Sequence, residues 1–250
     1  MNWHERYLHQ AAWTLELRRY LFEKCNWAGA RRVLEVGCGT GAVLRDPAGA
    51  RHQPHSTPEL CGLDIAAGAL YECRKHAPDA RLTQGNALAL PYSQEAFDIT
   101  YCHFLLLWIE QPIQALQEMK RVTVRSGYVL ALAEPDYRAR IDEPAELAWL
   151  GQLQNEALER QGASLSRGSE LADLFKRAGI RILETGQITP AARDALTVEA
   201  WESEWDVLAA DLAGMVKPLE MQRMRALDRQ AWLHGERVLS VPTYFAWGQV

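Results

Sequence analysis

The stretch that decides the fold is Val33-Leu34-Glu35-Val36-Gly37-Cys38-Gly39-Thr40-Gly41. Its apolar first half predicts a buried strand over residues 32–36, and its alternating glycines predict a tight turn into a helix. Glycine adopts positive φ at little cost and lets the backbone approach a ligand where a Cβ would collide. A turn of this kind lies at the carboxyl end of a parallel sheet, where ligands bind in open α/β folds. The N–H groups at the start of the helix would face a polar part of that ligand.

Strand and helix patterns alternate outward from this turn. Further strands are predicted over residues 60–65, 80–83, 97–107, 128–133, 180–188 and 243–248, and core helices over residues 70–76 and 113–122. Such alternation is typical of an α/β fold, a parallel sheet with helices on both faces.

Helical patterns extend this core at both ends and in its second half. We expect one domain over residues 1–250, with a core at 30–137, 180–189 and 243–250. An N-terminal helix is expected over 3–24, and an added helical cap over 138–178 and 197–239. Five apolar residues of the cap repeat at helical spacing: Trp201, Trp205, Leu208, Leu212 and Met215. This spacing predicts that they form a core between the cap helices. Part of their surface is also a candidate lining for a binding pocket.

The composition argues against several classes of protein. With 250 residues, 48% hydrophobic and 24% charged, the chain has an ordinary globular balance. A formal net charge of −5 disfavours a nucleic-acid-binding surface, and the longest apolar run, 104–109, is too short for a membrane span. Five separated cysteines and the lack of a signal-peptide pattern indicate reduced thiols in the cytoplasm.

An acid follows the glycine turn by one strand-helix-strand step. Asp64 ends the second strand, where a carboxylate can accept both hydroxyl protons of a ribose. An acid at a strand end often only caps the next helix. Its spacing from the glycine turn favours the nucleoside interpretation.

Together these residues resemble the class I S-adenosylmethionine-dependent methyltransferases, small-molecule branch. The stretch Glu35 to Gly41 is similar to motif I, E/D-x-G-x-G-x-G. Gly85-Asn86-Ala87 stands where the family commonly has Asp. Arg121-Val122 with Arg125-Ser126-Gly127 resembles the R-V-L-x-P-G-G turn, although Arg and Ser replace Pro and Gly. The likeness covers roughly residues 30–137 and the last two strands.

The resemblance implies a Rossmann-like, seven-stranded, mostly parallel sheet with an antiparallel last strand, and S-adenosylmethionine as cofactor. It implies no metal. In related enzymes an N-terminal helix covers the cofactor, so Arg18 is a candidate for its carboxylate, with Trp13 as another; a plain solvent-facing stripe with Gln10 and Thr14 stays equally open. The remaining residues expected to bind the cofactor are Glu35, Gly37, Cys38, Gly39, Gly41, Asp64, Ile65, Asn86, Ala87 and Cys102.

His103 follows the fourth strand and is the catalytic candidate. A histidine there has the pKa to remove a proton from the methyl acceptor, but packing over the adenine or lining the pocket is the role that the position favours. The segment Glu134-Pro135-Asp136-Tyr137 either orients a polar acceptor or caps the chain that follows. His52 and His55 lie in a proline-containing loop and are expected to be solvated.

Two alternatives remain beside methyl transfer. Gly37-x-Gly39-x-x-Ala42 also fits the dinucleotide fingerprint of NAD(P)-dependent oxidoreductases, although the Glu35 carboxylate would repel a pyrophosphate. The second alternative is a protein that binds the cofactor but transfers no methyl group. Cys102-His103-Phe104-Leu105 stands where an amino-methyltransferase of DNA would have Asn/Asp-Pro-Pro-Tyr. The expected partner is therefore a small-molecule acceptor, not a nucleic acid or a membrane.

Overall fold

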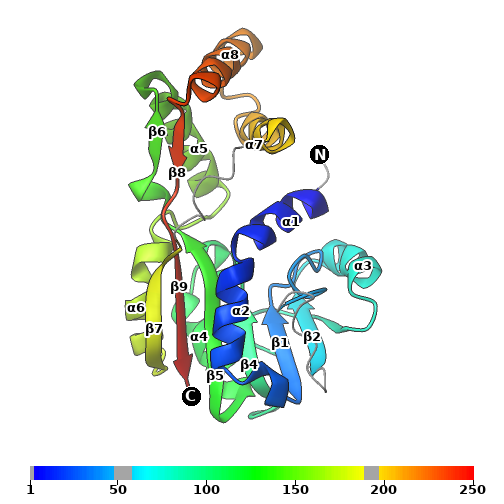
Figure 1. The fold of residues 1–250 in the computed structure, drawn as a ribbon. Coiled ribbons are helices and arrows are strands. Elements are labelled where there is room, and N and C mark those ends of the chain that lie inside the picture. The colour runs from blue at the N-terminus through cyan, green and yellow to red at the C-terminus, as the bar shows by residue number, and fades with distance from the viewer. Residues whose placement is uncertain (1–2, 48–57, 189–196) are drawn as a thin grey trace.

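The computed structural model describes residues 3–47, 58–188 and 197–250. A seven-stranded sheet has the order β3-β2-β1-β4-β5-β9-β7, with β1 to β5 parallel and β9 antiparallel to both neighbours (Figure 1). This confirms the mostly parallel sheet with its antiparallel last strand. The strands are β1 (Arg32–Val36), β2 (Glu59–Asp64), β3 (Arg81–Gln84), β4 (Phe97–Cys102), β5 (Thr123–Pro135), β7 (Arg181–Ile188) and β9 (Thr243–Gln249).

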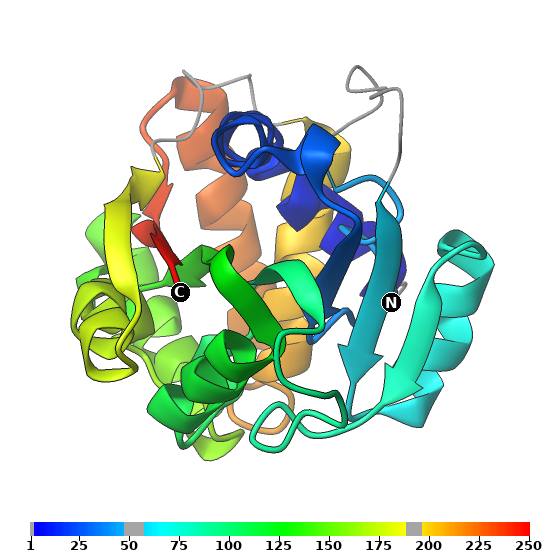
Figure 2. The same cartoon turned by 90° about the horizontal axis from the view of Figure 1, so that it is seen from below.

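Helices cover both faces of this sheet, as Figure 2 shows from below. On one face α2 (Leu15–Lys24) packs its Phe22 against Val33. On the other, α4 (Pro112–Val122) and α6 (Arg167–Arg177) pack against Leu34. Neighbouring residues of a strand point to opposite faces, so β1 has apolar residues on both sides, Val33, Leu34 and Val36, because both of its faces are buried. The helix α3 (Ala67–His76) contacts β2 and β3.

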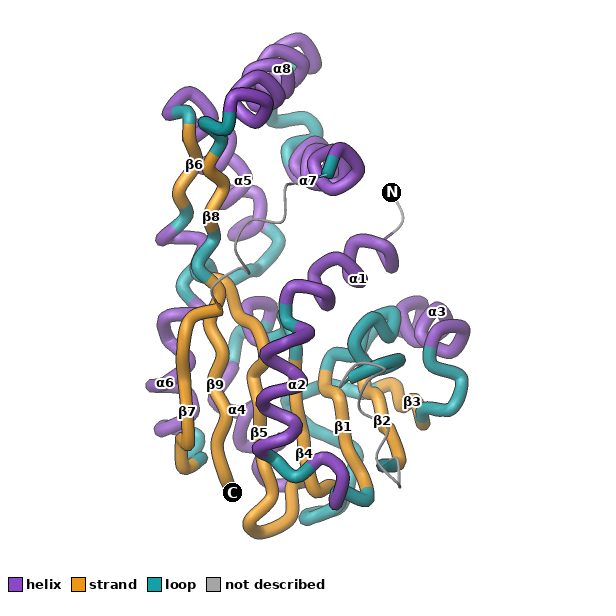
Figure 3. The backbone as a smooth tube through the Cα atoms, in the orientation of Figure 1, coloured by secondary structure: helices purple, strands orange, loops and turns teal. Residues whose placement is uncertain are grey.

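The N-terminal helix expected over 3–24 is two helices, α1 (Trp3–Trp13) and α2. The break falls at Thr14 (Figure 3). There the Ala11 carbonyl accepts the backbone N–H of Thr14 at 3.3 Å, its hydroxyl at 3.1 Å and Nη2 of Arg18 at 2.9 Å. Side chains that bond the backbone compete with helical hydrogen bonds. As a result α1 turns away from α2 and runs along the carboxyl edge of the sheet.

The cap differs from the helical expectation for 138–178 and 197–239. It holds α5 (Ala148–Arg160), α7 (Val198–Asp211) and α8 (Pro218–His234), but also an antiparallel pair, β6 (Ile141–Glu143) with β8 (Val238–Ser240). Three-residue strands are too short to show a period, and they form because they pair across the chain. The helix α6, expected in the cap, packs on the main sheet against β5, β7 and β9.

The core of the cap is the apolar cluster predicted from helical spacing. Trp201 and Trp205 are buried with Leu212. Both indole Nε1 groups donate to Oδ2 of buried Asp228, at 2.5 and 2.7 Å, and Nε of Arg237 donates to its Oδ1 at 2.7 Å. One carboxylate therefore satisfies two buried indole donors and one partly buried guanidinium donor. Within the residues described above, every helix is too short or too polar to cross a membrane.

Replacing Asp228 by Ala leaves these three donors without an acceptor. We expect the free energy of unfolding to fall by about 3 kcal/mol, because breaking a buried ionic hydrogen-bond cluster costs that order. Urea denaturation followed by tryptophan fluorescence measures the change. Asp206→Ala, on the exposed side of α7, is the control, with an expected change within about 0.5 kcal/mol. A loss no larger than that of the control contradicts the role of Asp228.

Candidate functional site

The glycine turn is held against the end of β2. The backbone N–H groups of Gly37 and Cys38 donate to the Leu63 carbonyl at 2.7 and 3.0 Å. A Cβ on Gly37, whose φ is +76°, would come within 2.7 Å of Leu105 Cδ1. A Cβ on Gly39, whose φ is +50°, would meet no atom within 4 Å. Gly37 is therefore required by packing, whereas Gly39 presents open backbone to a ligand.

The helix expected after this turn is absent from its described part. Residues 37–47 form successive turns, with the N–H of Gly41 bonded to the Cys38 carbonyl at 2.9 Å. Pro47 disfavours helical geometry at the residue before it, and the few residues left after Gly41 are too short to offset the cost of helix nucleation. The site thus offers turn N–H groups in place of a helix terminus, and a pyrophosphate would lack the helix N-terminus that a dinucleotide site provides.

Asp64 lies at the glycine turn, as predicted. Its Oδ2 accepts the N–H of Gly39 at 2.8 Å, and its Oδ1 accepts the N–H of Ala66 at 2.9 Å. A carboxylate has about four acceptor positions, so Asp64 can accept further hydroxyl groups. The neighbouring Ile65 is 68% exposed. An acid with spare acceptor capacity therefore stands beside an open apolar surface.

The segment of Asn86 and Ala87 is joined to the same edge. The N–H of Gly85 donates to the Asp64 carbonyl at 3.0 Å. The exposed Asn86 bonds its own turn, with Oδ1 accepting the N–H of Leu88 at 2.9 Å, and Ala87 is buried in the core. This brings Asn86 to the side of the site occupied by Asp64.

The cysteine side chains predicted to contact a ligand face inward. Cys102 is fully buried in the main core with Leu116, and Cys38 packs in a cluster with Cys73. Burial raises the pKa of the Cys102 thiol well above its usual value. In this structure the backbone of these two residues, and not the thiol, is what a ligand would meet.

Arg18 and Glu35 are both buried at the opposite end of the site. Arg18 is 3% exposed and Glu35 2%. In the described part of the chain, Nε and Nη1 of Arg18 have no partner, while its Nη2 donates to Ala11. Burial raises the pKa of Glu35. Two effects act against that rise: the Tyr101 hydroxyl donates to Oε2 of Glu35 at 3.1 Å, and Arg18 is positively charged. A buried cation with free donors thus stands within electrostatic range of a buried acid.

His103 faces the break between α1 and α2. Its Nε2 bonds Oγ1 of Thr14 at 3.0 Å, and its ring meets the Phe104 ring edge-on at 4.8 Å. Burial, with a contribution from Arg18, lowers the pKa of His103 to about 3. The imidazole is therefore neutral at physiological pH and a weak base, and its catalytic role stays a prediction.

Glu134 caps the loop after β4, which differs from both expected roles, orienting an acceptor or capping the chain that follows. Its Oε1 accepts the N–H groups of Leu105 and Leu106 at 3.0 and 2.7 Å, and its Oε2 accepts that of Leu107 at 2.9 Å. Phe104 has a left-handed φ of 51°, a conformation that costs a non-glycine residue about 1 kcal/mol. Since Leu105 packs on Gly37, Glu134 positions both this loop and the glycine turn. Sequence patterns gave no sign of that role.

The helix α1 lies over the glycine turn (Figure 1). Nδ1 of His4 bonds Oγ1 of Thr40 at 2.8 Å, and its ring stacks on that of His76 with centroids 3.4 Å apart. Burial raises the pKa of Tyr7, and the charge of Asp64 adds to the rise. These contacts place α1 as a cover along the site.

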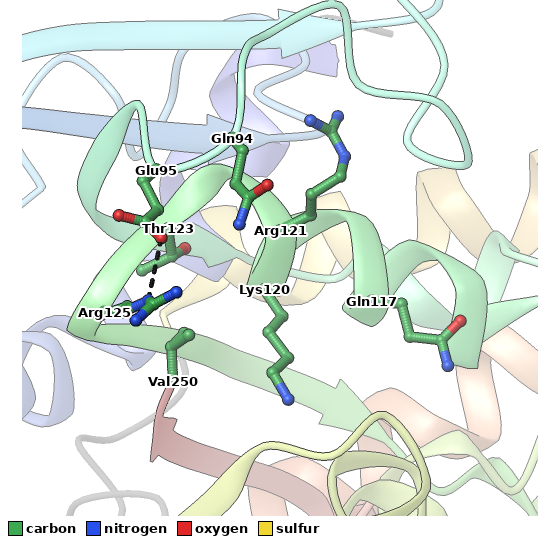
Figure 4. Close-up of a pocket in the computed structure, with 8 residues that line it drawn as sticks. All are labelled: Gln94, Glu95, Gln117, Lys120, Arg121, Thr123, Arg125 and Val250. Carbon is green, nitrogen blue, oxygen red and sulfur yellow. Dashed lines mark ion pairs between the residues drawn. The ribbon is translucent and has the colours of Figure 1, made fainter.

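Other candidate features lie elsewhere. A hollow of about 320 Å³ is lined by Lys120, Thr123 and Arg125, at the amino end of β5 (Figure 4). It belongs to the edge of the sheet opposite the glycine turn. His52 and His55 lie outside the described residues. Among those described, there is no group of three acidic, histidine or cysteine side chains placed to hold a metal ion.

The sequence relatives of this chain described below are methyltransferases. Residues 34–131 match a family model described as a methyltransferase domain. The chain is 28% identical to the O-methyltransferase resE of Aspergillus sclerotiorum over 186 residues, 72% of this chain and 66% of that enzyme. It is 32% identical to a malonyl-(acyl-carrier protein) O-methyltransferase of Halorhodospira halophila over 103 residues, 40% of this chain and 34% of that enzyme. The chain thus matches about a third of one curated relative and just under two thirds of the other.

Among solved structures, the (4+2)-cyclase SpnF shares the fold. It superposes with a TM-score of 0.59 at 20% identity, covering 94% of this chain and 80% of that chain. At this identity the likeness concerns the fold alone.

The buried carboxyl of Glu134 makes the stability depend on pH. Burial raises its pKa from 4.5 to about 7, against the bonds from Leu105, Leu106 and Leu107. The folded chain therefore holds this proton more tightly than the unfolded chain does. The stabilisation is full below the unfolded value of 4.5 and is lost as the pH rises through about 7.

We expect wild type to lose up to about 3 kcal/mol across this window relative to Glu134→Gln, which does not titrate. Urea denaturation of both proteins at a series of pH values measures the difference. Parallel stability curves for the two proteins would show that Glu134 does not titrate in this range.

Proposed function

Because the chain belongs to the class I S-adenosylmethionine-dependent methyltransferases, we propose that it transfers a methyl group from S-adenosylmethionine to a small-molecule acceptor. The observation that carries this proposal is the free donor pair of Arg18, buried within electrostatic range of Glu35. A cation and an acid at this spacing suit a zwitterion, which is the form of the cofactor's amino-acid end.

The adenosine end fits the other side of the glycine turn. We propose that the free acceptor positions of Asp64 bind the ribose hydroxyls and that the exposed Ile65 packs on the adenine. Asn86, joined to this edge through Gly85, is the proposed adenine contact. Gly39 separates the two ends, and the open space above its backbone leaves room for the cofactor between them.

The amino-acid end requires buried groups of both signs. Arg18 has two donors for a carboxylate, and a bidentate guanidinium–carboxylate pair is among the stronger hydrogen-bonded pairs. Glu35 would accept the ammonium group, and that cation favours the ionised form of a carboxyl whose pKa is raised by burial. Each charge left uncompensated in the structure thus gains an opposite charge from the ligand.

When bound, S-adenosylmethionine supplies a methyl group on a positively charged sulfur. What the chain then has to do is hold the acceptor at attack distance and exclude water. The cover formed by α1, through His4 on Thr40, serves the second purpose. His103, neutral and bonded to Thr14, is placed to orient an acceptor, and its lowered pKa makes it a weak general base.

We propose an oxygen atom as the acceptor. The two relatives described above are both named O-methyltransferases. An acidic oxygen loses its proton without a strong base, which suits a site whose histidine is neutral. The net charge of −5 supports a partner other than nucleic acid. Five buried, unpaired cysteines support a reducing location such as the cytoplasm.

A second candidate is a protein that binds the cofactor without transferring its methyl group. The fold itself does not decide against it, because a protein named as a (4+2)-cyclase shares that fold. Incubation with methyl-labelled S-adenosylmethionine and a panel of hydroxylated and carboxylated compounds separates the two. Label in a product supports methyl transfer, and cofactor binding without any labelled product supports the second candidate.

Asp64 tests the cofactor site. We expect S-adenosylhomocysteine to bind wild type in isothermal titration calorimetry and NAD not to bind. Asp64→Asn should weaken S-adenosylhomocysteine binding by about 10- to 100-fold, because hydrogen bonds to a charged group are lost. Asp79→Asn, an acid that follows α3, is the matched control and should bind as wild type does. Binding of NAD in place of S-adenosylhomocysteine would overturn the assignment.

Arg18 tests the amino-acid end separately. 5′-Methylthioadenosine shares the adenosine of S-adenosylhomocysteine but lacks the amino acid. Arg18→Met should weaken S-adenosylhomocysteine by about 10-fold or more and leave 5′-methylthioadenosine unchanged. Arg19→Met, whose partner is the exposed Glu16, should change neither. Equal losses for both ligands would mean that Arg18 shapes the site without binding the carboxylate.

A further inference from the structure

A second group of polar side chains gathers next to the proposed cofactor site. It lies between α1, the turn η3 (Tyr137–Ala139) and the cap helices α5 and α7. In Figures 1 and 3, α1 runs between α7 and the carboxyl edge of the sheet. Its central members are Arg6 of α1, Tyr137 of η3 and Asn155 of α5.

Arg6 has donors to spare. Among the described residues its guanidinium takes part in no hydrogen bond or ion pair, and burial lowers its pKa, while the nearby groups of Tyr137 and Asp211 act against that shift. Asp211 is already bonded to Nε2 of Gln154 at 2.8 Å. Glu204, also within range, is bonded to Nη2 of Arg237 at 2.7 Å. Glu204 is thus ion-paired with another arginine, Asp211 accepts a neutral amide, and among the described residues neither forms an ion pair with Arg6, so its guanidinium keeps its donors for a ligand.

Tyr137 faces Arg6 from the other side. Burial raises the pKa of its hydroxyl, and Arg6 and Arg140 act against the rise. Its carbonyl accepts Nδ2 of Asn155 at 2.9 Å, and Oδ1 of Asn155 is buried without a partner in the described part of the chain. A ligand with an acidic group and a hydroxyl or amide proton nearby would satisfy both the cation and this amide oxygen.

An apolar wall joins this cluster to the methyl-transfer site. Phe104 and Tyr137 pack against the same buried residues of the cap side, among them Leu107 and Leu158. The Phe104 ring also meets that of His103. A small molecule anchored at Arg6 would therefore lie along Phe104 with its other end toward His103.

We propose that Arg6 and Tyr137 bind the carboxylate of a small hydroxylated organic acid and that the hydroxyl at its other end is the methyl acceptor, an inference that rests on the function proposed above. The O–CH3 bond would form as the S–CH3 bond breaks, which leaves S-adenosylhomocysteine, and the hydroxyl proton would pass to solvent. A guanidinium matches a carboxylate with two parallel hydrogen bonds, and the tyrosine hydroxyl donates a third. The Phe104 wall takes the hydrocarbon part. A cationic acceptor would be repelled by the guanidinium of Arg6.

The test compares acids with their neutral amides. Protein saturated with S-adenosylhomocysteine is titrated by calorimetry with phenylacetate, 4-hydroxybenzoate and octanoate, and with the three corresponding amides. We expect at least one acid to bind, about tenfold or more tightly than its amide. Arg6→Met should abolish that preference and Arg6→Lys should retain part of it. Tyr137→Phe should weaken the acid and not the amide.

The control variant is Arg177→Met, whose exposed guanidinium pairs with Asp173 on α6; it should keep the preference for the acid. Equal binding of acid and amide, an undiminished preference in Arg6→Met, or no binding of any acid overturns the inference. Binding of S-adenosylhomocysteine to Arg6→Met distinguishes a failure of the acceptor inference from a failure of the proposed function. If it binds while the acids fail, only the acceptor inference is lost; if wild type fails to bind it, the proposed function is lost as well.

Discussion

The bonds from the glycine turn to the end of β2 fix the ligand edge of this protein. Gly37 and Cys38 both donate to the Leu63 carbonyl, and Gly39 donates to the carboxylate of the next residue, Asp64. Two neighbouring strands are thereby tied together at the point where their side chains leave the sheet. The loop after β4 joins the same junction through Leu105, and Glu134 holds that loop. A shift of any one of these elements would move the others, because they share close contacts.

The fold, and the set of residues that gathers at one edge of the sheet, could largely be predicted from the sequence because their signals are local. A strand buried on both faces is apolar, a glycine at positive φ has few substitutes, and an acid at a strand end falls at a fixed distance along the chain. Asp64 and Gly39 were expected at one edge for these reasons and Glu35 from the resemblance to motif I, and the structure brings the three to the same edge. The seven strands were found for the same reason, including the late β7 and β9.

The remaining features depend on contacts between distant residues. The β6 and β8 strands exist only as a pair, and the break at Thr14 follows from bonds that Arg18 and Thr14 make to Ala11. In the described residues after Gly41, up to Pro47, short turns stand where the start of a helix was expected, because Pro47 follows so closely. A glutamate at position 134 could orient a ligand or cap three N–H groups. The sequence is compatible with both roles, and only the fold shows which N–H groups it contacts. The low pKa of His103 likewise reflects its burial and the charge of Arg18, which no local pattern shows.

The course of α1 has a thermodynamic consequence. One short helix carries His4 over the glycine turn, Tyr7 near Asp64 and Arg6 toward the cap. A ligand that orders this helix from one side reduces the conformational entropy that a second ligand must remove from the other. The two binding equilibria are then coupled, and the coupling free energy is the same whichever ligand binds first. Occupancy of one site would raise affinity at the other without any contact between the two molecules.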